Sequence, residues 1–351
     1  MFDFPASPSV GQQFTPAGGP TWQWNGTVWL MAAAPGVVVL QQPYNWLING
    51  ELDVFQRGNQ ALPINLGANF VGYTLDRWYA ACQTGMSLSM TRGAVSPGSW
   101  GGAIYYGDWS FTGTGAAGSY VSQKIEGVRN LAGKSITVSG WMGLLAAGNI
   151  NVQPVQRFGT GGSPSGSVVV TSQNVAVPGG GLTTPFSLKF DIPAITGKTL
   201  GSNNDDYLEI QFGITNPNAQ RLFMTHMSVT EGDMRGLADP FTRRSPQQEL
   251  ALCQRYYYGS YTVGAANTFV NTLWSGNAVN AVTYFAYAYL PTPMRVAAPS
   301  IIAANLSASQ FPAAVGTLAG ITPNIIRESR VANATGNGAL FVSGLYLDAE
   351  L

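Results

Sequence analysis

The sequence has little histidine, cysteine or charge, and each scarcity narrows the possible functions. His226 is the one histidine of 351 residues, so a histidine-based triad would have to use it and a zinc site could contain at most one imidazole. The residues around it, LFMTHMSV, include neither a nucleophile elbow nor clustered metal ligands. We therefore expect His226 to be structural, and we predict no catalytic residue, no metal and no cofactor.

The two cysteines and the weak charge exclude further classes. Cys82 and Cys253 lie far apart in the sequence and are expected to be small buried residues rather than a disulfide framework. Charged residues make up 10% of the chain and the net charge is zero. A nucleic-acid partner is not expected, because phosphate binding requires a basic excess.

Long apolar runs are missing as well. The longest candidate, MAAAPGVVVL, is short and interrupted by Pro35 and Gly36, whereas a membrane helix needs about 20 apolar residues. The first residues, MFDFPASPSV, have neither the basic nor the apolar region of a secretion signal. We expect no membrane insertion, and synthesis in a reducing cytosol fits this pattern.

Glycine, proline and small polar residues dominate what is present. The chain has 43 glycines and 21 prolines, a composition typical of many short strands joined by tight turns. In DYLEIQFGI, apolar residues from Leu208 to Ile214 alternate with polar ones, as in a half-buried strand. Several such segments predict an all-β protein with a central jelly-roll β-sandwich, although a barrel would give the same pattern.

Changes in composition and hydrophobic pattern along the sequence divide the chain into five segments. The predicted segments are an N-terminal β-hairpin module (1–33), a linker (34–45), a jelly roll (46–244), one short helix (245–258) and a small C-terminal β domain (259–351). Within the fourth segment we expect a helix over 246–257, with Ser245 as its N-cap and Gln248 completing a capping box. Its buried stripe is expected to contain Leu250, Cys253 and Tyr257.

The hairpin module is predicted from TWQWNGTVWL, at residues 21–30. An Asn-Gly pair between alternating segments favours a two-residue turn, which would place Trp24 opposite Thr27 and Trp22 opposite Trp29. Trp22, Trp24 and Trp29 would then share one face. This face could stack on sugar rings or dock against another protein.

Aromatic side chains next to planar polar ones point to saccharide binding, because sugar rings stack on aromatic faces and their hydroxyls need hydrogen-bonding partners. Alternation along the predicted strands opposes Trp141 to Ile136 and Val138. Glu209 and Gln211 are likewise expected opposite an apolar face, and Gln123 opposite Val121 and Ile125. The candidate glycan-binding residues are Trp141, Gln123, Glu209 and Gln211, together with a second group in the segment SWGGAIYYGDWSF: Trp100, Tyr106 and Trp109. A core position for Trp141 is the alternative interpretation.

Several segments together resemble phage proteins. The N-terminal Trp-hairpin segment of many tailed-phage and prophage tail proteins resembles FPASPSVGQQFTPAGGPTWQWNGTVWL. The carbohydrate-binding-module-like jelly roll of phage tail fibre and receptor-binding proteins is similar to NWLINGELDVFQRGN, GYTLDRWYA, SQKIEGVRNLAGKSITVSGWM and DPFTRRSPQQELALCQRYYYGSY. The C-terminal part of the same group resembles PTPMRVAAPSI and YLDAEL.

This resemblance implies a virion component. It implies a homotrimeric tail fibre or spike subunit, assembled in the host cytoplasm, that joins other tail or baseplate proteins through its N-terminus and binds a bacterial surface polysaccharide. Trp22, Trp24 and Trp29 are then the expected docking residues. Related jelly rolls often hold a structural calcium near the end of the last strand, where this chain has His226.

Two alternatives to a non-enzymatic receptor-binding subunit remain open. A glycan depolymerase would need two carboxylates across the scissile bond, and the sequence does not pair its acidic residues. A purely structural head or tail decoration protein would contact other virion proteins alone.

Overall fold

The computed structural model describes residues 4–16, 19, 21–31, 43–57, 64–113, 118–215, 220–236, 241–259, 271–296, 299–309, 311 and 317–351. The chain divides into two compact units, Met1–Pro43 and Tyr44–Leu351. Most of the predicted linker, at residues 34–42, lies outside the described residues.

The N-terminal unit contains a three-stranded antiparallel sheet of β1 (Gln13–Phe14), β2 (Trp22–Trp24) and β3 (Trp29–Met31). Its hairpin register differs from the predicted one, since Trp24 lies opposite Trp29 rather than Thr27. The loop is wider because the Asn25 side-chain oxygen accepts hydrogen bonds from the backbone N–H groups of Thr27 and Val28, at 2.9 and 2.8 Å. The shift is two residues, so the three tryptophans still share one face.

Two phenylalanines cover this tryptophan face. Phe4 stacks on Trp29 with ring centroids 5.3 Å apart and meets Trp22 edge-on at 5.4 Å. Phe14 contacts Phe4 and Trp29 at 5.5 and 6.1 Å, and Trp24 lies 5.7 Å from Trp29. The tryptophans therefore form the hydrophobic cluster of their own unit, because a two-stranded ribbon alone could not cover them.

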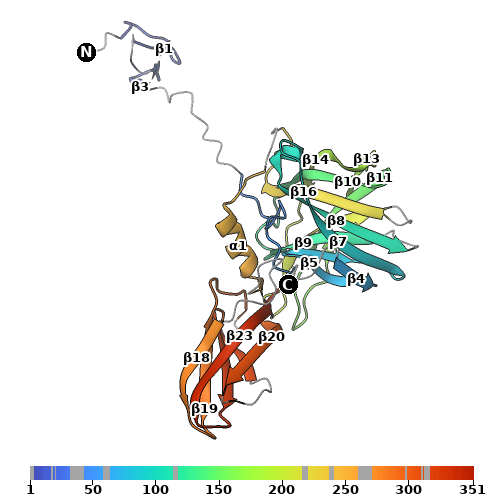
Figure 1. The fold of residues 1–351 in the computed structure, drawn as a ribbon. Helices are drawn as coiled ribbons and strands as arrows, with labels where there is room; N and C mark the ends of the chain where they lie inside the picture. Colours follow the sequence, from blue (N-terminus) through green and yellow to red (C-terminus); the bar gives the residue numbers. More distant parts are fainter. Residues whose placement is uncertain are drawn as a thin grey trace. The chain divides into compact units, whose positions relative to one another are not determined.

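The second unit begins with a two-layer β-sandwich (Figure 1), which confirms the predicted all-β class. In the described residues, the seven-stranded sheet has the order β12 (Val168–Val169), β11 (Gly148–Arg157), β15 (Tyr207–Ile214), β9 (Tyr120–Glu126), β6 (Trp78–Ala81) and β5 (Val71–Leu75), and β13 (Gln173–Val177) pairs with β11. The six-stranded sheet has the order β14 (Gly181–Asp191), β10 (Ser135–Leu144), β16 (Gln220–Glu231), β8 (Tyr105–Gly113), β7 (Met86–Ala94) and β4 (Ile64–Ala68).

The inner faces of the two sheets form the main hydrophobic core. Leu208, Ile210, Phe212 and Ile214 of β15 are at most 1% exposed, as their alternation predicts. Residues of the opposite parity point away from the core. We call these two sides of the sandwich the outer faces of the seven-stranded and six-stranded sheets.

His226 occupies a β-bulge between β10 and β16, where the register shifts between Ser139 and Trp141. Its backbone has φ +55°, a left-handed conformation that is uncommon outside glycine. The imidazole stacks on Phe241 with centroids 4.1 Å apart, and its Nδ1 lies 2.6 Å from a Glu51 carboxylate oxygen. The imidazole is thus buried, at 4% exposure, between Glu51 and Phe241.

The helix α1 (Pro246–Gln254) follows the sandwich. The Ser245 hydroxyl accepts the Gln248 N–H at 3.3 Å, as the capping box predicts. The helix ends before the predicted residue 257, because Tyr257 begins the next strand. The predicted stripe is also wrong at Leu250, which is 38% exposed. Glu249 is buried instead, since its carboxylate binds the Asn49 N–H and Arg244.

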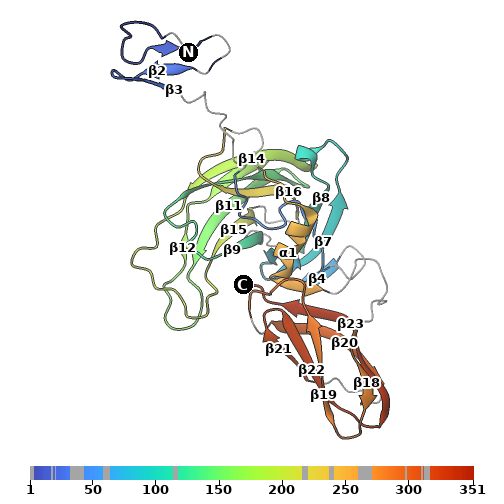
Figure 2. The same ribbon diagram turned by 90° about the vertical axis from the view of Figure 1, so that its left-hand side faces the viewer.

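The C-terminal part of the second unit contains two small sheets (Figure 2). In the described residues they are a four-stranded sheet of β17 (Tyr257–Gly259), β23 (Gly336–Asp348), β18 (Asn271–Ala278) and β20 (Ser300–Ser309), and a three-stranded sheet of β19 (Thr283–Tyr289), β22 (Ile325–Val331) and β21 (Thr317–Thr322). No helix of the described residues is long and apolar enough to cross a membrane.

A buried arginine joins this C-terminal part to the sandwich. Arg77 is 1% exposed; one Nη pairs with the Glu350 carboxylate and the other donates to the Lys124 carbonyl at 2.5 Å. The guanidinium also lies over the Tyr256 ring, 3.5 Å from its centroid. Arg57 binds the other oxygen of Glu350 at 2.9 Å. We call these contacts the arginine junction.

Replacing Arg77 with methionine should destabilise the second unit by about 3–5 kcal/mol, because it leaves Glu350 buried without one of its cations. Urea unfolding of the full chain measures the change. Arg235→Met is the matched control, since Arg235 and its partner Asp233 are 55% and 42% exposed, and it should leave the unfolding curve unchanged. Equal curves for both variants would contradict the importance of the junction.

Candidate functional site

The outer face of the seven-stranded sheet gathers tyrosines and planar polar groups into rows. The strand register sets one row that crosses five strands: Gln153, Gln211, Ser122, Tyr79 and Tyr73. A parallel row places Arg157 beside Tyr207, and Tyr120 lies beside Gly213 on the other flank. We call this surface, with Glu209 at its centre and Lys124 opposite Glu209 on β9, the tyrosine face.

The carboxylate of Glu209 is held rigidly in the middle of the tyrosine face. It is 2% exposed and accepts the Ser122 hydroxyl at 2.8 Å through one oxygen. Its other oxygen binds Arg157 through Nη2 at 3.1 Å and Nε at 3.3 Å. The Arg157 side chain is 37% exposed, so part of its guanidinium is accessible beside the buried carboxylate.

The tyrosine rings surround this carboxylate. Burial raises the pKa of Tyr207 to about 12, and the Glu209 charge adds to the rise. Burial and Glu209 also raise the pKa values of Tyr79 and Tyr120. The Lys124 ammonium lies 4.5 Å from the Tyr79 ring centroid. At neutral pH these phenols keep their protons, so the face presents ring surfaces and hydroxyl donors side by side.

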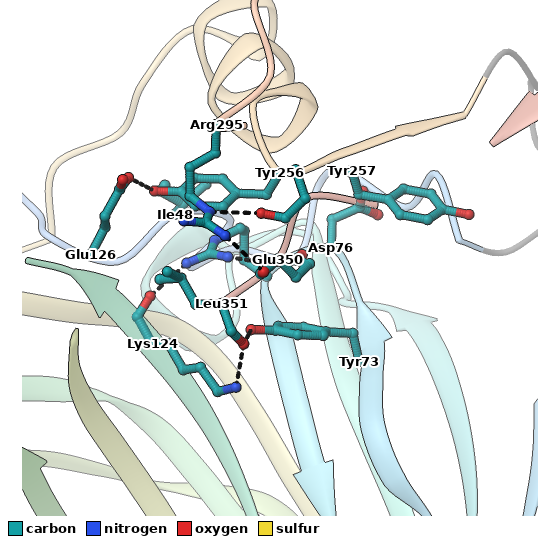
Figure 3. Close-up of polar contacts among 12 residues, drawn as sticks. Ile48, Tyr73, Asp76, Lys124, Glu126, Tyr256, Tyr257, Arg295, Glu350 and Leu351 are labelled. Atoms are coloured by element: carbon teal, nitrogen blue, oxygen red, sulfur yellow. Dashed lines mark hydrogen bonds and ion pairs between the residues drawn. The ribbon is translucent and has the colours of Figure 1, made fainter. Parts of the chain in front are cut away.

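One end of the tyrosine face is closed by the last residues of the chain. The Lys124 ammonium and the Tyr73 hydroxyl both donate to the Leu351 carbonyl, the latter at 3.2 Å (Figure 3). Arg295 holds the same segment by donating to the carbonyls of Ala349 and Glu350, at 2.7 and 3.1 Å. A ligand on this face therefore extends away from Leu351, over Tyr79, Tyr120 and Gln211.

The structure brings the sequence-predicted residues together in two pairs, one on each outer face, and separates the others. Glu209 and Gln211 share the tyrosine face. Gln123 does not: it is 1% exposed, faces the core on the same side of β9 as Val121, and exchanges two hydrogen bonds with the Ile48 backbone at 2.7 and 2.8 Å. Its number has the same parity as that of Val121, so period-two alternation places both inside.

The predicted tryptophans divide between the opposite sheet and the core. Trp141 is half-buried on the outer face of the six-stranded sheet, where it pairs with Thr225. Trp100 and Tyr106 lie on the same side of the sandwich and line a pocket there. Trp109 is fully buried and donates through Nε1 to the Thr74 hydroxyl at 2.8 Å. A glycan-binding role for Trp109 is therefore wrong.

Sequence reasoning missed most residues of the tyrosine face. These are Tyr73, Tyr79, Tyr120, Tyr207, Ser122, Lys124, Gln153 and Arg157. The signal was present in part, because Tyr207 precedes Glu209 by two residues and Tyr120 precedes Ser122 by two. Period-two reading along each strand would have placed these pairs on one face.

A smaller pocket of about 210 Å³ lies near the start of α1, lined in part by Glu51, Asp53, Arg243 and Glu249. Burial and the neighbouring Glu51 raise the pKa of Asp53 to about 6. Arg243 binds Glu51 at 2.8 Å. Within the described residues, no three histidine, cysteine, aspartate or glutamate side chains are grouped as metal ligands.

No protein-family model matches the sequence, and no curated protein matches it. Solved structures with a similar fold include the CBM22-1 xylan-binding domain from Paenibacillus barcinonensis, with 16% identity, 49% of this chain and 97% of that chain covered, and a TM-score of 0.28. A family 11 carbohydrate-binding module from Clostridium thermocellum, in complex with a β-1,3-1,4-mixed-linked tetrasaccharide, has 11% identity, covers 49% and 96%, and has a TM-score of 0.28.

A phage protein is also among the similar structures. The enzymatically active domain of tailspike protein 4 of bacteriophage CBA120 has 16% identity and a TM-score of 0.34, and the match covers 54% of this chain and 21% of that one. The similar structures include carbohydrate-binding modules and a phage tailspike domain.

Replacing Asp53 with asparagine should stabilise the protein at pH 7 by about 1 kcal/mol, a value discounted for the partial exposure of this group. The pKa of Asp53 rises from 3.8 to about 6 on folding. Between these two pH values the folded state therefore binds one more proton at Asp53 than the unfolded state does. The contribution of protonated Asp53 to the free energy of unfolding is therefore fully present below pH 4 and is lost as the pH rises through 6. Urea unfolding at several pH values measures the loss.

The Asp53→Asn variant should show a smaller fall in stability between pH 4 and 7 than the wild type. Asp233→Asn is the control, because Arg235 lowers the pKa of exposed Asp233 to about 2, below this range. An unchanged slope in Asp53→Asn would show that Asp53 does not titrate near pH 6.

Proposed function

We propose that the chain is a non-enzymatic phage tail fibre or spike subunit whose sandwich binds a bacterial surface polysaccharide along the tyrosine face. The open part of the row, from Gln153 to Tyr79, carries this proposal. It places the amides of Gln153 and Gln211 in line with the Tyr79 ring, while the buried Ser122 between them donates its hydroxyl to Glu209. A sugar ring requires this combination, because its C–H faces stack on aromatic rings while its hydroxyls need planar hydrogen-bonding partners.

The rigidity of the face favours binding of an extended chain. Tyr73 and Tyr79 meet edge-on at 5.4 Å, and Tyr79 lies 6.4 Å from Tyr120. Such fixed rings lose little conformational entropy when a ligand binds. Leu351 closes one end of the face, so the polysaccharide runs across the strands from Tyr79 toward Gln153.

The contacts of Glu209 support a binding role over a hydrolytic one. Both carboxylate oxygens already accept hydrogen bonds, from Ser122 and from Arg157. A glycosidase needs one carboxylic acid that donates a proton and a second carboxylate across the scissile bond. Glu209 is instead fixed as an acceptor that orients Arg157 toward the ligand.

The N-terminal unit supports attachment to a particle. Its tryptophans are held together by Phe4 and Phe14, whereas Val10, Val28 and Leu30 are 76%, 50% and 53% exposed. We propose that these apolar side chains contact another tail or baseplate protein, and that Trp22, Trp24 and Trp29 maintain the unit that presents them. A homotrimeric assembly in the virion tail belongs to the same proposal.

Replacing both Tyr79 and Tyr120 with alanine should raise the dissociation constant for the recognised polysaccharide by about 100-fold, through the loss of two stacking rings. The experiment titrates the full chain by calorimetry with a panel of bacterial capsular polysaccharides and lipopolysaccharide O-chains, xylan and mixed-linkage β-1,3-1,4-glucan. Released oligosaccharides are measured in parallel.

Tyr287→Ala and Tyr289→Ala together make the matched control, since these residues lie on β19, outside the sandwich, and are 42% and 72% exposed. This variant should bind like the wild type. Binding to no member of the panel, or equal binding by both variants, would overturn the proposed site. Release of oligosaccharides would instead show a depolymerase.

Leu30→Glu should reduce incorporation of the subunit into particles without altering the N-terminal fold, because it places a charge on an exposed apolar position. Trp29→Ala should reduce both incorporation and the near-ultraviolet circular dichroism of the unit. Incorporation is measured by quantifying the subunit in purified particles. Normal incorporation of Leu30→Glu would argue against docking through this surface.

A further inference from the structure

A second aromatic pocket lies on the opposite side of the sandwich, on the outer face of the six-stranded sheet. It has a volume of about 640 Å³ and is lined by Trp100, Tyr106, Phe223 and Arg221, with Gly180 and Gly181 at its rim. A Cβ added at either glycine would meet no atom within 4 Å. The rim is therefore open to a ligand.

The indole of Trp100 is held in place by a strained turn. Trp100, Gly101 and Gly102 have φ values of +47°, +68° and +78°, and this conformation costs a tryptophan about 1–3 kcal/mol. Arg243 anchors the turn by donating to the Gly102 carbonyl at 2.6 Å. Gly101 lies against the His226 ring, where an added Cβ would be 3.0 Å from Nε2.

Tyr106 and Phe223 extend the aromatic wall. Trp100 meets Tyr106 edge-on, with centroids 6.0 Å apart and planes at 88°, and Tyr106 lies 6.2 Å from Phe223. The Tyr106 ring crosses over Gly93, where a Cβ would come within 2.3 Å of Cζ. Glycine at this position thus allows the ring to lie flat against β7.

Arg221 supplies the polar edge of the pocket. Its Nε donates to Asp108 at 3.1 Å and its Nη2 binds the other carboxylate oxygen. The guanidinium lies 5.1 Å from the Phe223 ring centroid, and the side chain is 42% exposed. Since Asp108 balances its charge, the exposed donors suit hydroxyl groups better than an anion.

We propose that this pocket is a second saccharide-binding site, for uncharged sugar units of a polysaccharide. It extends the proposed function to a second face and rests on the same recognition chemistry: fixed aromatic rings beside a planar hydrogen-bonding group. The two sites lie on opposite outer faces of one sandwich. Each sandwich thus binds two polysaccharide segments, which strengthens attachment to a surface that presents many chains.

Tryptophan fluorescence tests the second site separately, because none of the side chains named for the tyrosine face is a tryptophan. The full chain is titrated with the same polysaccharide panel, and the signal of Trp100 is taken as the part that Trp100→Phe removes. In the Tyr79→Ala, Tyr120→Ala variant this signal should still respond to a neutral polysaccharide. Calorimetry should then show binding at one site instead of two.

Trp100→Ala should raise the dissociation constant of the second site by about 10-fold or more, whereas Trp100→Phe keeps a ring and should retain binding. Val331→Ala is a control on an exposed position of β22. If the tyrosine face binds but Trp100 never responds and Trp100→Ala leaves the stoichiometry unchanged, the second site is wrong. If no polysaccharide binds either face, both the proposed tyrosine-face site and the second site are wrong.

Discussion

The buried pairing of Arg77 with Glu350 fixes the arrangement of the second unit. A guanidinium without a partner in this environment would be strongly destabilising. Besides Glu350, Arg77 has two further partners, because it donates to the Lys124 carbonyl and lies over the Tyr256 ring. Glu350 follows β23, Lys124 lies on β9, and Tyr256 lies just after α1. One side chain therefore connects the sandwich, the helix and the C-terminal sheets.

This junction also shapes the tyrosine face through Lys124. The backbone carbonyl of Lys124 belongs to the junction, whereas its ammonium binds the Leu351 carbonyl and lies near the Tyr79 ring. The segment that closes one end of the face is consequently held by the same contacts that attach the C-terminal sheets. The position of the closed end is set by long-range ion pairing, and the open end by the strand register alone.

The sequence allowed the strands to be predicted but not their neighbours. Period two correctly placed Leu208 inside and Glu209 outside, because that choice depends on one strand. Trp141 also points outward, but its strand belongs to the other sheet, and the pairing of β10 with β16 is a contact between residues about 90 positions apart. Arg77 and Glu350 are separated by 273 positions, so no local pattern reveals their pairing.

The hairpin register was missed for a different reason, since the Asn25 side chain replaces a two-residue turn by a wider one.

The two-sheet architecture explains why the two proposed binding surfaces lie on one domain. Packed sheets lie about 10 Å apart, and each strand alternates between the shared core and its own outer face. The buried tryptophans, Trp78 and Trp109, fill the core with ring centroids 6.1 Å apart, while tyrosines on one outer face and Trp100 on the other remain accessible. Sites placed back to back on so rigid a body cannot close around the same sugar units. The two proposed sites would therefore bind separate segments, and the gain in affinity would come from bivalency rather than from a deeper pocket.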